Sequence, residues 1–211
     1  MITNKSLFTL GILLILSLVA LCQGKWELKR DDNGIEVYTR KPLSGSLKEL
    51  RVTCELNATK KQLINTLEDI GEYGKWVYST KKNDLLKTVN SQQLIYYTAC
   101  HLPWPLKDRD LIVELSILPG ASPDQFKIEA KSLPNYLPGN PDFIRVPYSL
   151  AQWNVKVINE HTLQVDYTFS VDPGGNIPVW MVNSTLATGP YNSFVKLKQL
   201  LKNMNTGYAA N

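Results

Sequence analysis

The residues best placed to do chemistry are Arg109 and Asp110, which follow the turn-rich segment Leu102-Pro-Trp-Pro-Leu-Lys-Asp108. They open an alternating stretch, in which successive side chains point to opposite faces, so Arg109 would share a face with Leu111 and Val113. A cation on an apolar face needs a partner. Arg109 is therefore expected either to anchor the polar end of a ligand by charge-assisted hydrogen bonds or to form a structural ion pair.

Residues for acid–base or metal chemistry are sparse. The chain has two histidines, of which His101 ends an alternating stretch and His161 lies in a turn. The motifs of serine hydrolases, zinc proteases, P-loops and Rossmann folds are missing from the sequence. The cysteines and histidines also lack the spacing of zinc ligands. We therefore expect no metal, no cofactor and no enzymatic activity.

The N-terminal residues 1–24 have the pattern of a secretory signal peptide. Lys5 is followed by the apolar run 7–21 and then by small residues up to Gly24. A membrane-spanning helix needs about 20 apolar residues, and this run is shorter. Cleavage after Cys22 or Gly24 would place the protein in the periplasm or outside the cell. The alternative is a lipoprotein signal with Cys22 as the acylated residue.

The net charge argues against nucleic acid as a partner, and the state of the two remaining cysteines is left open. Without Lys5 the formal charge falls from +4 to +3, and no basic run is long enough to track phosphates, so nucleic acid is not an expected partner. Cys54 and Cys100 both lie in strand-like alternation. They could pair in an exported chain or remain small buried hydrophobic residues, which is the usual habit of free cysteine.

Alternation of apolar and polar residues predicts a sheet of about eight strands. Short turn-rich segments separate them, which is typical of antiparallel hairpins rather than βαβ units. The predicted strands cover residues 35–40, 47–56, 84–89, 94–102, 109–118, 125–133, 143–158 (bent or bulged) and 162–171.

Helical spacing appears in two places. Thr59 and Gln62 form a capping-box pattern before apolar residues up to Ile70. The segment Asp172–Gly175 ends the last strand, and a long helix then runs from Pro178 to Met204, kinked or restarted at Gly189-Pro190 because proline cannot donate a helix hydrogen bond. Residues 205–211 are expected to be a frayed tail.

These elements predict a single α+β domain over residues 25–204. A curved antiparallel sheet wraps round the long C-terminal helix, because a sheet of that size twists and cannot stay flat. One helix laid across the curl rarely fills it with side chains alone, so we expect an internal cavity. Nothing in the sequence suggests an oligomer, and a monomer is expected.

Four motifs resemble the START (StAR-related lipid-transfer) domains of the helix-grip fold. They are the segments Asp32–Arg40, Leu102–Asp110, Phe143-Ile-Arg-Val146, and Asp172–Trp180 followed by Asn183 and Gly189-Pro190. The resemblance implies an apolar tunnel holding one sterol, phospholipid or fatty acid-like ligand. The C-terminal helix and the loop 135–142 would form its lid, and transient contact with a membrane surface would accompany loading.

The resemblance also implies which residues meet the ligand, with Arg109 looking into the cavity. If the apolar candidates instead only pack together in the hydrophobic core, they need no ligand. The alternative function implied by the wider superfamily is a cyclase- or hydrolase-like cavity enzyme for a lipid-like or polyketide-like substrate. The ligand-binding candidates are Arg109, Leu111, Val113, Trp153, Val165, Tyr167, Phe169, Trp180, Met181 and Ser184.

Overall fold

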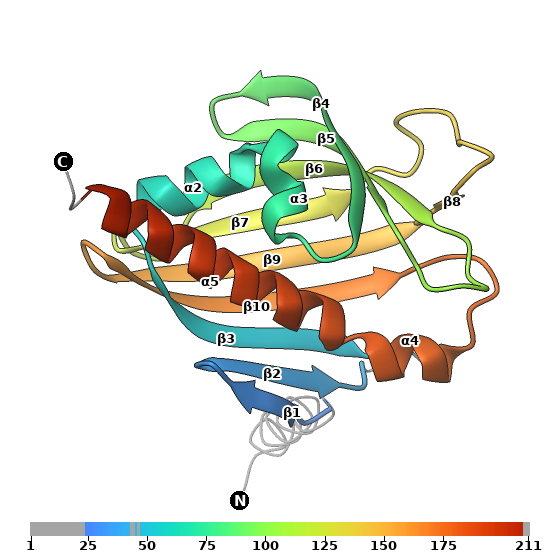
Figure 1. Cartoon of the computed structure of the whole chain (residues 1–211), viewed down its shortest axis with the longest axis horizontal. Coiled ribbons are helices and arrows are strands. Elements are labelled where there is room, and N and C mark those ends of the chain that lie inside the picture. Colours follow the sequence, from blue (N-terminus) through green and yellow to red (C-terminus); the bar gives the residue numbers. More distant parts are fainter. Residues whose placement is uncertain (1–23, 43–44, 46, 209–211) are drawn as a thin grey trace, which may run out of the picture.

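A computed structural model describes residues 24–42, 45 and 47–208, and the predicted signal peptide lies outside them apart from Gly24. The described chain forms one curved sheet in the order β1-β2-β3-β10-β9-β7-β6-β5-β4, and β8 pairs in parallel with β6 (Figure 1). The strands are β1 (Glu27–Asp32), β2 (Ile35–Arg40), β3 (Glu49–Asn57), β4 (Thr80–Asn90), β5 (Gln93–Cys100), β6 (Arg109–Pro119), β7 (Gln125–Ser132), β8 (Ile144–Arg145), β9 (Tyr148–Asn159) and β10 (Thr162–Asp172).

The sheet of the described residues has ten strands, so the prediction of about eight was too low. β1 was missed because all six of its residues, Glu-Leu-Lys-Arg-Asp-Asp, are exposed, and an edge strand without a buried face shows no alternation. The predicted strand 143–158 is two strands, β8 and β9. Pro147 lies between them and lacks the N–H that a continuous ladder would use.

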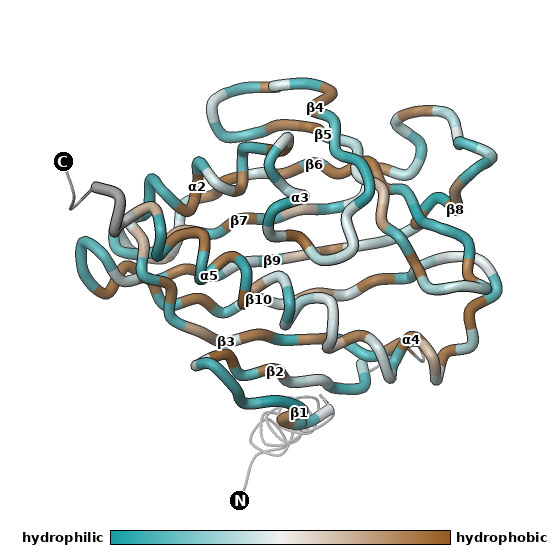
Figure 2. Tube along the Cα trace, viewed as in Figure 1, coloured by the Kyte–Doolittle hydropathy of each residue, from teal (hydrophilic) through white to brown (hydrophobic). Residues whose placement is uncertain are grey.

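The alternation predicted from the sequence defines the two faces of the sheet, and Figure 2 shows it along the strands. Val52 of β3 pairs with Val37 on one side and with Tyr167 on the other, so the apolar sets of neighbouring strands meet on one face. Figure 1 shows that the helices lie on that side, with α5 running diagonally across the sheet. This concave face carries the main core.

The predicted first helix is α2 (Lys60–Glu68), and its capping box is confirmed. The backbone N–H of Gln62 donates to Thr59 Oγ1 at 3.1 Å, and the N–H of Thr59 donates to Gln62 Oε1 at 2.8 Å. A short 3₁₀ turn, η1 (Ile70–Glu72), leads into α3 (Tyr73–Trp76). Trp76 ends α3 with its side chain buried.

The C-terminal segment forms two helices, α4 (Val179–Thr185) and α5 (Thr188–Tyr208). The predicted restart is present, although the break precedes Gly189-Pro190. Pro190 lies in the first turn of α5, where its missing N–H would have no helical acceptor in any case. The helix continues to Tyr208, so the first four residues of the predicted frayed tail are helical. Within the described chain, no helix combines the length and apolar character needed to cross a bilayer.

One face of α5 closes the core against the sheet. Tyr191, Phe194, Leu197 and Leu201 follow helical spacing and are at most 4% exposed. The tip of the β1–β2 hairpin also holds this helix, because the Tyr191 hydroxyl donates to Asp32 Oδ2 at 2.7 Å and Lys198 Nζ donates to the Asn33 carbonyl at 3.0 Å. The edge hairpin therefore fixes where α5 crosses the sheet.

A buried ion pair ties β8 and the connection that precedes it to the interior strand β6. Arg145 donates to both carboxylate oxygens of Asp110 at 2.9 Å, and Asp110 is 0% exposed. The remaining guanidinium hydrogens reach the backbone carbonyls of Pro134 (2.9 Å), Leu137 (3.2 Å) and Pro138 (3.3 Å). One arginine thus folds the predicted lid loop 135–142 back onto the sheet.

Replacing Arg145 by methionine should lower the free energy of unfolding by about 3–5 kcal/mol, because it leaves the Asp110 carboxylate buried without a partner. Lys75→Met is the matched control, since the Lys75–Glu72 pair is exposed and such pairs contribute about 0–1 kcal/mol. Urea denaturation of both variants measures the difference. Equal losses would mean that the Asp110–Arg145 pair contributes no more than a surface pair.

Candidate functional site

A cavity of about 300 Å³ lies between the concave face of the sheet and the helices α3 and α5. Six strands, β4, β5, β6, β7, β9 and β10, supply its floor and walls, and the first turns of α5 supply its roof. Most of the lining atoms are apolar. The lining residues are Leu67, Tyr73, Trp76, Val77, Tyr78, Thr80, Tyr96, Thr98, Cys100, Leu111, Val113, Leu115, Ala130, Ser149, Ala151, Trp153, Tyr167, Phe169, Gly189, Pro190, Ser193 and Phe194.

Two aromatic clusters form opposite walls of this cavity. On the β10 side the Trp153 ring lies 4.9 Å from that of Tyr167 and 5.0 Å from that of Phe194 of α5. On the α3 side the Tyr73 ring contacts Trp76 at 5.1 Å and Tyr96 at 5.4 Å, both edge to face. Such rings are large rigid surfaces that pack against a ring system or an acyl chain.

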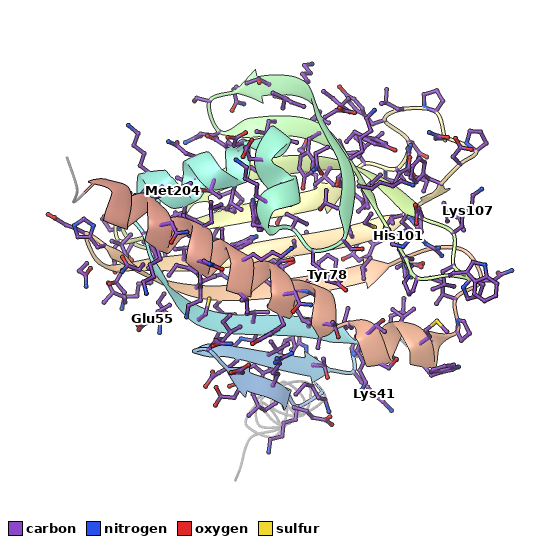
Figure 3. All side chains as sticks on the ribbon, in the orientation of Figure 1. Lys41, Glu55, Tyr78, His101, Lys107 and Met204 are labelled. Atoms are coloured by element: carbon purple, nitrogen blue, oxygen red, sulfur yellow. The ribbon has the colours of Figure 1, made fainter. Side chains whose placement is uncertain are left out.

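Most hydroxyls in the lining are already bonded to the protein. Tyr73 donates to the Leu67 carbonyl at 2.6 Å, Thr98 donates to Asn83 Oδ1 at 2.8 Å, and Ser193 donates to the Gly189 carbonyl at 3.0 Å. Ser193 also accepts the backbone N–H of Tyr78, which holds Tyr78 beside the N-terminal half of α5 (Figure 3). These bonds stabilise the walls and leave few polar groups for a ligand.

The structure brings five of the predicted binding residues together in the lining: Leu111, Val113, Trp153, Tyr167 and Phe169. Burial in this apolar surrounding raises the pKa of the Tyr167 hydroxyl, which is therefore neutral at physiological pH. Val165 lies on the same face but is 0% exposed and packs in the closed core beyond the cavity. Contact of these five lining residues and of Val165 with a ligand stays a prediction.

Arg109 is buried, yet its donors point at the protein backbone. Nε donates to the Pro173 carbonyl at 3.2 Å, Nη2 to the Gly174 carbonyl at 3.0 Å, and Nη1 to the Lys107 carbonyl. These bonds fasten the connection between β10 and α4 to the start of β6. Arg109 is not among the residues that line the cavity. Of the two expected roles, the geometry favours a structural one, although the pairing is with carbonyls and not with a carboxylate.

Trp180, Met181 and Ser184 do not line the cavity either. All three lie on α4, and the Trp180 side chain is 69% exposed. α4 ends at Thr185, before α5 begins at Thr188, and it has no buried residue, whereas α5 has a buried apolar face. The roof is formed instead by Gly189, Pro190, Ser193 and Phe194.

Several lining residues lie outside the set of predicted binding residues, above all Trp76 and Tyr96. Tyr96 lies on the same face of β5 as Leu94 and Thr98, so the two-residue period of this strand was a usable signal. Trp76 carried no periodic signal because α3 has only four residues. Cys100 also lines the cavity, whereas Cys54 is buried in the core, where burial raises its pKa to about 12. Both are free thiols, so the open alternative of a disulfide between them is wrong.

The histidines and charged groups lie away from the cavity. His101 is exposed on the β5–β6 connection near Lys107 (Figure 3), with its Nδ1 2.9 Å from Asp108 Oδ1. Asp108 also accepts Lys81 and the Leu102 N–H, and these donors lower its pKa to about 2. Within the described ranges, no three His, Cys, Asp or Glu side chains gather in a way that could hold a metal.

Comparison with known proteins identifies relatives along most of the chain. It is 26% identical over 173 residues to an uncharacterized protein of Pseudomonas aeruginosa, covering 82% of this chain and 85% of that one. It is also 26% identical to mouse START domain-containing protein 10, over 76% of this chain and 55% of the mouse protein. The chain thus spans about half the length of this mammalian relative.

Among solved structures, one similar fold is a STAR-related lipid transfer protein (fragment 25–204) from Xanthomonas axonopodis. It superposes with a TM-score of 0.76 at 27% identity and covers 84% of this chain and 98% of its own. The model of the START domain family matches residues 14–206. The curved sheet, the helix that grips it and the cavity between them are therefore those of a family member: this chain belongs to the START domain family.

Proposed function

We propose that this protein binds one hydrophobic molecule in the cavity beneath α5 and transfers it between a membrane and a second site. The observation that carries the proposal is the apolar cavity of about 300 Å³, walled by two aromatic clusters and roofed by the start of α5. Each 100 Å² of apolar ligand surface buried there contributes about 2.5 kcal/mol before the costs of association. Membership of the START domain family supports the same function.

We also propose that the protein acts by binding and not by catalysis. The lining residues offer hydroxyls, a thiol and two indole N–H groups, but no carboxylate, imidazole or amine. General acid–base catalysis needs a group whose pKa lies near the working pH. Burial raises the pKa of both Cys100 and Tyr96 away from that range. These groups therefore suit a wall better than an active site.

The connection between β10 and α4 is the proposed gate. Gly174 and Gly175 have φ angles of +66° and +67°, which glycine adopts without strain. A Cβ on Gly175 would lie 3.0 Å from Ile144 Cδ1 and 3.3 Å from Arg109 Nη2. Arg109 thus holds a tightly packed joint from which α4 and the first turn of α5 extend, and release of this joint would uncover the cavity.

The first experiment is native mass spectrometry of gently purified protein, which should show the chain with one bound lipid-sized molecule. Exposure of the purified protein to lipid extracts of varied composition should restore the same adduct after it is stripped. A protein that stays empty after all these extracts would contradict the proposed function. Chemical turnover of a retained molecule would contradict the claim that the protein only binds.

Filling the cavity should abolish this binding while the fold remains. Ala151 lines the cavity, and Ala151→Phe places a ring inside it, which should weaken ligand binding at least tenfold. The control is Gln152→Phe, because Gln152 is exposed on the opposite face of the same strand. Circular dichroism confirms folding of both variants. Equal affinity of the two variants would show that the ligand does not occupy the cavity.

Gly175→Ala should loosen the gate, because alanine at this φ and at these contacts costs about 1–3 kcal/mol in the closed conformation. We expect a lower free energy of unfolding and faster ligand release, measured by stopped-flow transfer of a fluorescent lipid to vesicles. Gly139→Ala is the control, since nothing lies within 4 Å of its Cβ position. Lower stability with an unchanged release rate would show that the β10–α4 connection is only structural and does not gate the cavity.

We propose further that the protein is exported, on the pattern of residues 1–24. The mass of the mature protein, measured on material from cells that express the full chain, should correspond to a chain beginning at Gln23 or Lys25. A mass increased by acyl chains on Cys22 would support the lipoprotein alternative. The mass of the uncleaved chain would overturn the expectation of cleavage.

A further inference from the structure

The wall of the cavity is thinnest at Tyr78. Of the residues that line the cavity, Tyr78 alone is exposed, with 45% of its surface accessible to solvent. Trp76 and Phe194, which line the cavity from α3 and α5, are 6% and 3% exposed. A residue that borders the cavity and also meets solvent forms a wall of one side chain. An entrance at Tyr78 would therefore need the smallest movement of the protein.

The Tyr78 ring connects two elements that border the cavity. Tyr78 belongs to the turn 77–79 between α3 and β4, and Figure 3 shows it beside the N-terminal half of α5. Its Cδ1 lies 3.7 Å from the position that a Cβ on Gly189 would occupy, so the ring packs over the first turn of α5. Among the described residues, no hydrogen bond holds the Tyr78 hydroxyl. The ring is therefore kept in place by packing, and no polar contact at its tip opposes its movement.

A single backbone hydrogen bond joins Tyr78 to α5. The Tyr78 N–H donates to Ser193 Oγ at 2.9 Å, and the Ser193 hydroxyl donates in turn to the Gly189 carbonyl at 3.0 Å. The bond to Tyr78 lies at the surface, where water can replace the hydroxyl as acceptor. One net hydrogen bond of this kind shifts an equilibrium by about two- to tenfold. It is strong enough to keep Tyr78 closed and weak enough to break often.

The residues on either side of Tyr78 are fixed. Trp76 is buried at the end of α3, and Thr80 begins β4. Ser79 has a φ of +60°, a left-handed conformation that is unfavourable for a residue with a Cβ. Two bonds to His101 hold it there, from Ser79 Oγ to the His101 carbonyl at 2.6 Å and from the His101 N–H to the Ser79 carbonyl at 2.8 Å. Strained backbone held in this way is common at clamps and switches, and here it confines movement to Tyr78.

We propose that Tyr78 closes an entrance through which a hydrophobic ligand reaches the cavity, between the turn 77–79 and the first turn of α5. The Ser193 hydroxyl holds the entrance closed, and Gly189 provides the flat surface on which the ring packs. This inference rests on the proposed function, because it assigns the route to the same cavity. The entrance differs from the gate at the β10–α4 connection, since α4 and the roof stay in place when Tyr78 moves.

Stopped-flow fluorescence with N-phenyl-1-naphthylamine tests the entrance, because this uncharged probe becomes brighter in apolar surroundings. Tyr78→Ala removes the ring and should raise both the association and the dissociation rate constant about fivefold or more, with a much smaller change in Kd. Tyr136→Ala is the control, since Tyr136 is 43% exposed and outside the lining. Faster dissociation with unchanged association would make Tyr78 only a ligand contact and overturn the inference. Equal acceleration by the control would also overturn it.

Ser193→Ala keeps the Tyr78 ring and removes the acceptor of its backbone N–H. Both rate constants for the probe should rise about two- to tenfold, the value of one net hydrogen bond. Thr185→Ala is the control, because the Thr185 hydroxyl also donates to the carbonyl four residues earlier, that of Met181 at 3.0 Å, but does not contact Tyr78. Equal rate constants for the two variants would show that Ser193 does not hold the entrance closed.

Amide hydrogen exchange of the wild-type protein gives an independent measurement if a variant does not fold. The Val77 N–H donates to the Tyr73 carbonyl at 2.7 Å, so it opens only when the end of α3 unwinds. The Tyr78 N–H should therefore have a protection factor about tenfold lower than that of Val77. Equal protection would show that Tyr78 moves only together with α3.

The outcomes separate this inference from the proposed function. Absence of probe binding by the wild-type protein would overturn the proposed binding cavity and the entrance together. Binding with rate constants that Tyr78→Ala leaves unchanged would overturn the entrance alone, and the β10–α4 connection would then be the route to the cavity.

Discussion

The structure depends on covering the apolar concave face of one curved sheet with a single helix. The two halves of α5 do this differently. Its C-terminal half inserts Leu197 and Leu201, both 0% exposed, and fills the curl with ordinary core. Its N-terminal half presents Gly189, Pro190 and Ser193, which are too small to reach the strands below, so space remains under them. The cavity is therefore a consequence of where small residues lie along one amphipathic helix.

The charged residues of the central strand are used for scaffolding, and this keeps the cavity neutral. Asp110 and Arg145 neutralise each other on one side of β6, and Arg109 bonds three backbone carbonyls on the other. Both arrangements hold connections at the same end of the sheet, the 135–142 loop and the segment before α4. Arg109, Asp110 and Arg145 thus hold connections at this end of the sheet, and the cavity lining consists of aromatic, aliphatic and neutral polar residues.

Alternation predicted the strands that have one buried face, because burial on one side leaves a period of two in the sequence. It missed β1, where every residue is exposed, and it joined β8 to β9 across Pro147. The capping box at Thr59 and the restart near Pro190 were predictable, since both follow from local backbone chemistry. The orientation of Arg109 and the exposure of Trp180 were not, because both depend on where the β10–α4 connection turns.

The cavity links ligand binding to the stability of the fold. Lining atoms that face a void lack dispersion partners, and a ligand that fills the void supplies them. Such a ligand stabilises the folded state by RT ln(1 + [L]/Kd), so a molecule that binds in the cavity must also raise the free energy of unfolding.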